Sequence, residues 1–380
     1  MRDDTRLISL ARPPIADDPF DQHPSTRRMS PVSSEFLFRV RRSYRLALEL
    51  SPAPTGRIWS KINRMRADVH DALLADSDEP LREIFTAPDR TDLFYGADNT
   101  AKSIAKGSTG NRTRDLENDF ALLDRIVNRL NESDPETALT RLDAKLRQTI
   151  TFPSISDDEA GIITSRGVAS YRALQAIYQA WRVLELTNGN ANSAILEIGP
   201  GLGRAIFYCY RAGLTDLTTI DLPLGVVAQA YFLGRGLGPE RIWLLGDDPQ
   251  LAAGRIKLLP AGYRLGRFDL VVNVDSLVEM PLITQIEYLR LIAKSGALLL
   301  SINHSIGGFS VEKVVRTFLP CSEVKTKPYP MRKGYAESCF KLAKPAEITL
   351  AFRLRYIFTR CVASVQYRTR NILKSCFVKH

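Results

Sequence analysis

The chain has 380 residues, 44% of them hydrophobic, and a formal net charge of +10. At roughly 100–200 residues per domain, this length indicates two structural units, or one large domain with an extension. Its five cysteines are scattered and form no CxxC pair, so they indicate neither a disulfide framework nor a zinc site, and they favour a reducing compartment, the cytoplasm. The N-terminus lacks the apolar segment of a secretory signal, and no apolar run approaches the length of about 18 residues that a membrane span needs.

Residues 1–50 are rich in Pro, Ser, Arg and Asp, and they predict a flexible N-terminal segment. Residues 51–150 repeat apolar side chains at three- and four-residue spacing, which predicts a helical N-terminal region. Residues 151–167 predict a turn-rich connector, and residues 169–187 predict an amphipathic helix that leads up to the turn Asn188-Gly189-Asn190.

Buried strands and helices then alternate from about residue 191 to residue 341. The predicted strands are "AILEIG", "DLTTIDL", "RIWLLG", "FDLVVNVDS" and "ALLLSINH", and helical segments lie between most of them. This alternation with short connections predicts an α/β fold, a Rossmann-like doubly wound sheet with helices on both faces, within a domain spanning residues 151–345. Ligands bind to such sheets beyond the carboxyl ends of the strands.

The first predicted strand runs into the glycine loop "AILEIGPGLGRA", in which Glu197 precedes Gly199, Gly201 and Gly203. A dinucleotide site has the spacing G-x-G-x-x-G, but here Arg204 occupies the sixth position. The spacing G-x-G-x-G after an acid resembles motif I of class I S-adenosylmethionine (SAM) methyltransferases. SAM carries a cationic sulfonium in place of a phosphate, and an acid near the loop suits that charge. The resemblance implies SAM as the cofactor.

Further cofactor contacts are expected after the next strands. Asp221 ends the second strand, 22 residues after the first glycine, where an acid accepts both ribose hydroxyls, and Leu222 lies beside it. NAD-binding folds place an acid there too, so this feature does not separate the two cofactors. By the methyltransferase pattern, Asp247, with Asp248 as the alternative, accepts from the adenine amino group, unless these acids form a solvated turn. Asn273, near the end of the fourth strand, is a further candidate.

Candidate catalytic residues follow the fourth and fifth strands. Asp275 and Glu279 come after the fourth, and His304 ends the fifth. Methyl transfer to a hydroxyl needs positioning and removal of the hydroxyl proton, for which a carboxylate or a histidine is suited. The alternatives are structural: Asp275 or Ser276 caps a helix, and His304 is an ordinary buried histidine. The acids after the third and fourth strands carry oxygen ligands, but no spacing pattern calls for a metal.

Three segments together narrow the resemblance. "ILEIGPGLGR", "IDLPLGVVAQAYFLGR" and "FDLVVNVDSLVEM" resemble the sugar O-methyltransferase family of bacterial glycan and glycosylated natural-product pathways. The resemblance is clearest over residues 161–304, and "TDLFYGADN" (residues 91–99) is also similar. It implies SAM as the methyl donor and, as the acceptor, a sugar hydroxyl of a glycan, nucleotide sugar or glycosylated metabolite. It does not identify the base.

Two other functions remain open. An NAD(P)-dependent sugar-modifying oxidoreductase is disfavoured by Arg204 and by the lack of a Tyr-x-x-x-Lys pair after the fourth strand. A catalytically inactive methyltransferase-fold binding subunit is disfavoured by the intact glycine loop. The N-terminal helices could cover the acceptor site, with Tyr95 as an acceptor contact, build a homodimer, or simply pack on the body.

Most of the positive charge lies at the C-terminal end. From Lys341 to His380 the chain has nine Lys or Arg residues and one acid, a net charge of +8, so the remainder is nearly balanced. The overall charge therefore does not predict a nucleic-acid partner. The basic C-terminal segment, residues 346–380, could lie on an anionic membrane or an acidic glycan, contact a partner subunit, or form a solvated face.

Overall fold

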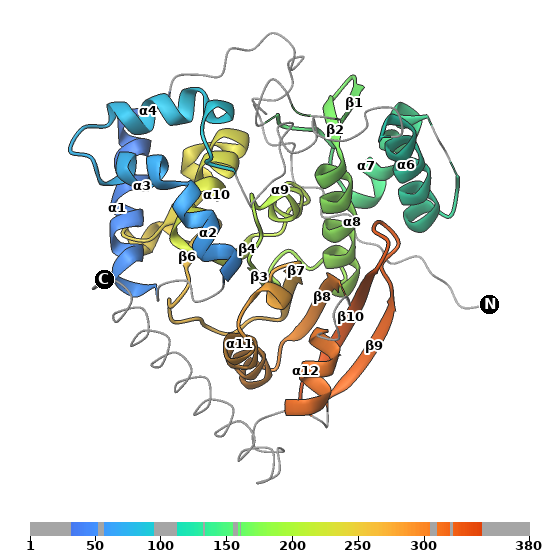
Figure 1. The fold of residues 1–380 in the computed structure, drawn as a ribbon. Helices are drawn as coiled ribbons and strands as arrows, with labels where there is room; N and C mark the ends of the chain where they lie inside the picture. Colours follow the sequence, from blue (N-terminus) through green and yellow to red (C-terminus); the bar gives the residue numbers. More distant parts are fainter. Residues whose placement is uncertain are drawn as a thin grey trace, which may run out of the picture.

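The computed structural model describes residues 32–51, 57–94, 112–131, 134–154, 159, 161–304, 310–319 and 322–343. Their centre is an eight-stranded sheet of order β5-β6-β4-β3-β7-β8-β10-β9 (Figure 1). The strands from β5 to β8 in this order run parallel, and β10 and β9 are antiparallel additions. The strands are β3 (Ala194–Ile198), β4 (Asp216–Asp221), β5 (Ile242–Leu244), β6 (Ile256–Pro260), β7 (Leu270–Val274), β8 (Leu298–His304), β9 (Glu323–Pro328) and β10 (Tyr335–Lys341).

Helices cover both faces of this sheet, which confirms the predicted doubly wound α/β fold. One apolar cluster joins the sheet to α8 (Tyr171–Leu186), α9 (Arg204–Arg211) and α10 (Pro223–Leu237). A second cluster joins the opposite face to α11 (Leu282–Ser295) and α12 (Val311–Phe318). Successive side chains of β3 point to opposite faces of the sheet, so Ile195 belongs to the first cluster and Leu196 to the second.

The order of the strands reverses at β3. The chain passes from β3 to β4 on one side, and β7 pairs with β3 on the other. The segments that follow β3, β4 and β7 therefore meet at the carboxyl ends of these strands, around the crevice where doubly wound folds bind ligands.

The sequence patterns missed several strands. The predicted strand "RIWLLG" forms β5, but β5 is a three-residue strand at the sheet edge, and the unpredicted β6 separates it from β4. β6 is only five residues long and ends in Pro260, so its sequence carries little strand signal. Part of the predicted connector forms an antiparallel hairpin of β1 (Gly161–Thr164) and β2 (Gly167–Ser170).

Helix α1 (Ser34–Leu50) corrects the prediction of a flexible segment over residues 1–50. The Ser33 hydroxyl caps the helix by accepting a hydrogen bond from the Phe36 amide at 3.2 Å. Phe36, Val40 and Tyr44 recur at four-residue spacing and are buried as α1 packs against α10. Residues 1–31 and the basic segment 346–380 lie outside the described residues.

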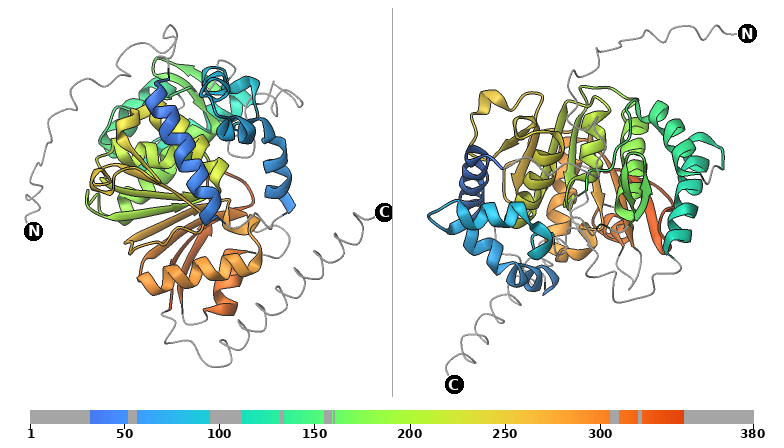
Figure 2. Two further views of the ribbon diagram at one scale, coloured as in Figure 1. Left: turned by 90° about the vertical axis from the view of Figure 1, so that its left-hand side faces the viewer. Right: turned by 90° about the horizontal axis from the view of Figure 1, so that it is seen from above.

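The predicted helical region is divided between two places (Figures 1 and 2). The first group lies on the α10 side of the molecule and the second packs against α8. None of the described helices has both the length and the apolar character needed to cross a membrane. The first group comprises α2 (Arg57–Met65), α3 (Ala67–Leu74), which contacts α1, and α4 (Glu79–Thr86), and the second comprises α6 (Arg112–Asn128) and α7 (Pro135–Leu146).

Candidate functional site

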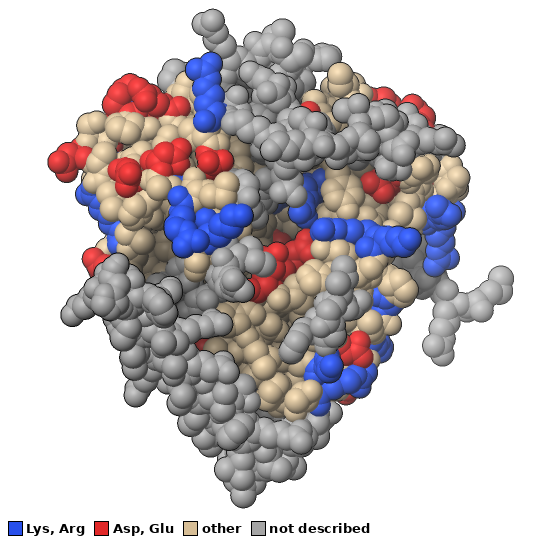
Figure 3. Space-filling model, in the orientation of Figure 1, with Lys and Arg blue, Asp and Glu red and all other residues tan. Residues whose placement is uncertain are grey.

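A cavity of about 260 Å³ opens where the segments after β3, β4 and β7 meet. Helices α2, α8 and α11 also contribute to its wall, and Figure 3 shows acidic side chains in a central hollow with Lys and Arg beside them. The cavity brings together seven of the residues predicted from sequence. These are Glu197, Gly199, Gly201, Asp221, Leu222, Asp275 and Glu279.

The glycine loop between β3 and α9 has a left-handed backbone at each glycine. The φ angles of Gly199, Gly201 and Gly203 are 64°, 63° and 81°. A Cβ atom on Gly199 would lie 2.4 Å from the Ser276 side chain, which itself donates a hydrogen bond to the Ile198 carbonyl at 2.7 Å. Only glycine therefore lets the loop turn this tightly against the segment that follows β7.

Replacing Gly199 with alanine should cost more stability than the left-handed backbone alone explains. Gly213→Ala is the matched control, because Gly213 also has a positive φ of 92° but has nothing within 4 Å of an added Cβ. We expect about 1–2 kcal/mol of destabilisation for the control, and a further 1–3 kcal/mol, roughly the cost of overpacking, for Gly199→Ala in urea unfolding. Equal losses in the two variants would contradict a steric role for the Ser276 contact.

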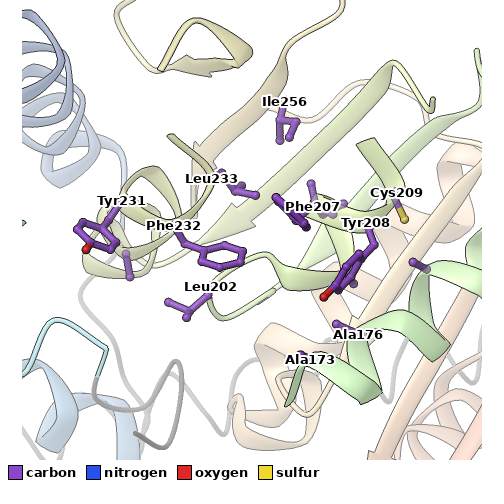
Figure 4. Packing of buried hydrophobic residues seen from close by; sticks show 14 of the residues in the cluster. Ala173, Ala176, Leu202, Phe207, Tyr208, Cys209, Tyr231, Phe232, Leu233 and Ile256 are labelled. Atoms are coloured by element: carbon purple, nitrogen blue, oxygen red, sulfur yellow. The ribbon is translucent and has the colours of Figure 1, made fainter. Parts of the chain in front are cut away.

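Apolar side chains pack around the glycine loop between β3 and α9 (Figure 4). Leu202 is buried, and Phe207 of α9 packs on Phe232 of α10 with ring centroids 5.7 Å apart. Leu233 lies 3.1 Å from the position of a Cβ on Gly203, which forms the N-cap of α9. Gly203 thus shapes the loop without lining the cavity.

Glu197 is a buried carboxyl, 3% exposed, in the wall of the cavity. Burial, and then the nearby Asp221, raise the pKa of Glu197 to about 8. Its Oε2 atom is buried without a hydrogen-bond partner among the described residues. Such an atom is costly unless a ligand satisfies it, so Glu197 is suited to a cationic or hydrogen-bond-donating group inside the cavity.

Asp221 ends β4 with both carboxylate oxygens held. Oδ1 accepts from the Leu222 amide at 2.7 Å, and Oδ2 accepts from Gln229 Nε2 at 2.9 Å. A Cβ on Gly225 would lie 2.6 Å from this carboxyl group, so glycine leaves it room. Burial raises the pKa of Asp221 to about 7, against the lowering effect of the Leu222 amide and of Arg66. The fixed carboxyl keeps further lone pairs for a ligand in the cavity.

Two residues from the N-terminal helices line the cavity and were not predicted, Trp59 of α2 and Arg66 at the start of α3. Arg66 is 1% exposed, and burial lowers its pKa to about 10, against the raising effect of Asp221 and Asp92. The helical pattern of this region marks neither residue as functional. A tryptophan and an arginine in an otherwise amphipathic segment carry no local signal, and only the tertiary fold brings them to the cavity.

Besides Gly203, two other predicted cofactor residues do not line the cavity. Asn273 is fully buried and donates to the Ile198 carbonyl at 3.1 Å, so it joins β7 to β3 behind the glycine loop. Asp247 lies beyond β5, where it pairs with Arg39 at 2.7 Å and Arg42 at 3.1 Å. Because two guanidinium groups of α1 hold this carboxylate at the sheet edge, the structure does not support an adenine contact by Asp247. The alternative, Asp248, caps a short 3₁₀ turn, η4 (Pro249–Leu251), with its side chain.

Asp275 lines the cavity, and its carboxylate pairs with two arginines. Its Oδ2 atom accepts from Arg332 Nη1 at 2.8 Å and from Arg172 Nη1 at 3.4 Å. Burial raises the pKa of Tyr335, and a hydrogen bond with Asp275 raises it further. Asp275 has a φ of 62°, an uncommon conformation for a residue other than glycine. A carboxylate that two cations already neutralise is better suited to fixing geometry than to accepting a proton.

Glu279 ends the 3₁₀ turn η5 (Leu277–Glu279) and lines the cavity. Its Oε2 atom accepts a hydrogen bond from the Trp59 indole at 3.0 Å. Burial raises the pKa of Glu279, and Asp275 raises it further, while Trp59 and His304 lower it. His304 does not line the cavity, although its Nδ1 atom is buried without a hydrogen-bond partner among the described residues. Of the three candidate bases, Glu279 combines access to the cavity with a raised pKa.

The cavity has no arrangement typical of a metal centre. Within the described ranges, no three His, Cys, Asp or Glu side chains are grouped to hold a metal ion. Arg204, which occupies the position where a dinucleotide loop has its third glycine, lines the cavity and pairs with Glu159 at 2.7 Å. Its guanidinium also lies over the Phe232 ring, 5.1 Å from the centroid.

No protein-family model and no curated protein sequence matches the chain. Among solved structures, it is similar to the magnesium protoporphyrin IX methyltransferase of Synechocystis with bound SAM, at 16% identity over 46% of this chain and 80% of that one, with a TM-score of 0.32. It is also similar to an O-methyltransferase from Bacillus cereus in complex with SAH, at 12% identity over 59% and 96% of the two chains and a TM-score of 0.33. A third is the glycopeptide N-methyltransferase MtfA, at 16% identity over 43% and 94% and a TM-score of 0.32.

Proposed function

We propose that the protein is a SAM-dependent methyltransferase that transfers a methyl group to a sugar hydroxyl. The observation that carries the proposal is one cavity with a glycine loop and two buried acids on one side and the raised-pKa carboxyl of Glu279 on another. The solved structures similar to this chain include methyltransferases with bound SAM or SAH, and they act on different acceptors. The sugar acceptor rests on the resemblance of the three sequence segments.

The residues present fit SAM. The unpartnered Oε2 atom of Glu197 suits a cationic group, and the glycines let the backbone approach a ligand without Cβ atoms in between. The Leu222 amide and the Gln229 side chain hold Asp221 in place, which supports its proposed role as acceptor of hydrogen bonds from ribose hydroxyls. When bound, SAM supplies an electrophilic methyl group with a good leaving group.

Glu279 then acts as the general base. Its raised pKa makes the ionised form a stronger proton acceptor than an exposed glutamate, so it can take the proton of a bound sugar hydroxyl. Asp275 pairs with Arg172, which lines the cavity, and with Arg332, and His304 influences Glu279 through its charge. Trp59 of α2 and Thr284 and Tyr288 of α11 also line the cavity in which this proton transfer takes place.

Calorimetric titration with SAM and with NAD tests the cofactor, and formation of SAH in the presence of a panel of monosaccharides and nucleotide sugars tests the reaction. We expect micromolar SAM binding, no NAD binding, and SAH formation with at least one sugar. NAD binding without SAM binding would favour the oxidoreductase. SAM binding with SAH formation on no sugar would favour another acceptor or the inactive binding subunit.

The affinity for SAM should rise with pH. In the ligand-free protein Glu197 is mostly protonated at pH 7, because its pKa is about 8, whereas a cationic ligand beside it favours the ionised form. Binding should therefore release a proton, and Kd should fall by up to roughly tenfold per pH unit between pH 6 and 8. Glu197→Gln should remove the share of this dependence that Glu197 contributes and leave the share of Asp221, whose pKa of about 7 lies in the same range. The same raised pKa stabilises the ligand-free fold at low pH, and this contribution is lost as the pH rises through about 8.

A further inference from the structure

We infer that Trp59 is a positioning residue for Glu279, which makes helix α2 part of the active site. The inference rests on the proposed role of Glu279 as the base. Trp59 and Glu279 both line the cavity, and they come from segments 220 residues apart in the chain. The indole Nε1–H donates to Glu279 Oε2 at 3.0 Å, a normal hydrogen-bond distance.

This hydrogen bond orients the carboxyl group of Glu279. Glu279 ends a three-residue 3₁₀ turn, so its own secondary structure provides little rigidity. A donor on Oε2 fixes the rotation of the carboxyl group and leaves Oε1 as the atom to accept a proton. The indole donor also favours the ionised form of Glu279, which partly offsets the effect of burial on its pKa.

A second cavity residue follows the other end of α2. Arg66 follows α2 directly, lines the cavity and lowers the pKa of Asp221. The segment from Trp59 to Arg66 therefore influences two of the cavity acids, Glu279 through the hydrogen bond of its first residue and Asp221 through the charge of its last.

The test observes Trp59 without requiring methyl transfer. The chain has three tryptophans, so ¹⁵N-tryptophan labelling gives three indole N–H signals. Trp59→Phe identifies the signal of interest. Trp243 is an internal control, because its Nε1–H donates to the backbone carbonyl of Asp248, a group that does not titrate. Charged or titratable groups around Glu279 are Asp275, Asp221, Arg172 and His304.

We expect the Trp59 signal to shift with pH, with a midpoint above 4.5, the ordinary value for glutamate, and the Trp243 signal to stay constant. Glu279→Gln should abolish the shift, and His304→Asn should retain it. A Trp59 signal that does not move with pH, or that moves equally in Glu279→Gln, would overturn the inference. These outcomes do not depend on the identity of the acceptor, so they are distinguishable from a failure of the proposed function.

Kinetics give the second readout once an acceptor is known. Trp59→Phe keeps the aromatic ring but removes the donor, so kcat should fall roughly tenfold or more, the usual effect of losing a hydrogen bond to a charged group. The acidic limb of the pH profile should move to higher pH, because the ionised form of Glu279 loses its donor. Unchanged SAM affinity would show that the variant is folded. An unchanged pH profile would contradict positioning of Glu279 by Trp59.

Discussion

Asp221→Asn should weaken SAM binding by about tenfold or more. The substitution removes the negative charge and replaces an acceptor oxygen with an NH₂ group, which cannot accept from a ribose hydroxyl. Two hydrogen bonds to a charged group contribute roughly 1.5–3 kcal/mol each, so the loss of one or both exceeds a factor of ten. Calorimetric titration of the variant with SAM measures the effect.

Asp216→Asn is the matched control for this experiment. Asp216 begins the same strand, β4, where it pairs with Lys257 at 2.5 Å and does not line the cavity. We expect its SAM affinity to stay within about twofold of the unmodified protein. Equal affinities for the two variants would remove Asp221 from the proposed ribose contact, and equal losses would point to a general effect on the strand.

Glu279→Gln should reduce the rate of methyl transfer by about 10²–10⁴-fold, the usual contribution of a general base. The amide keeps the size of the side chain but cannot take a proton. SAM binding should remain nearly normal, because the predicted cofactor contacts lie in the glycine loop and at the end of β4. Single-turnover formation of SAH separates the rate of the reaction from binding.

Glu287→Gln makes the same chemical change on the exposed surface of α11 and should leave the rate unaffected. His304→Ala provides the comparison among candidate bases. If His304→Ala is as slow as Glu279→Gln, the two residues act together in proton removal. If Glu279→Gln retains full turnover while His304→Ala loses it, the base is His304.

The strands around the cavity were predictable because their signals are local. Apolar runs that end in polar residues identified β3, β4, β7 and β8, and the spacing of glycines identified the loop. Glu197 and Asp221 lie next to these signals in the sequence, so their position near the carboxyl ends of the strands could be predicted before the fold was known. The same local reasoning missed β6, since five residues ending in proline show too little alternation to stand out.

Residues that reach the cavity from a distance could not be predicted. Trp59 and Arg66 meet the cavity because α1 packs against α10, α3 packs against α1 and α2 packs against α3, and no sequence pattern encodes those contacts. Asp247 shows the opposite case, a residue with a local signal that does not reach the cavity. An acid after a strand looked like a ligand contact, but it instead pairs with Arg39 and Arg42, more than 200 residues earlier in the chain.

The ion pairs of Asp247 have a consequence for any shortened form of the protein. Arg39 also donates to the carbonyls of Pro239 and Ile242, so α1 covers hydrogen-bonding groups at the edge strand β5. Exposed strand edges pair readily with other chains. Removing residues 1–50 would therefore uncover this edge. A shortened protein intended to be more soluble should keep Ser33 and every residue after it.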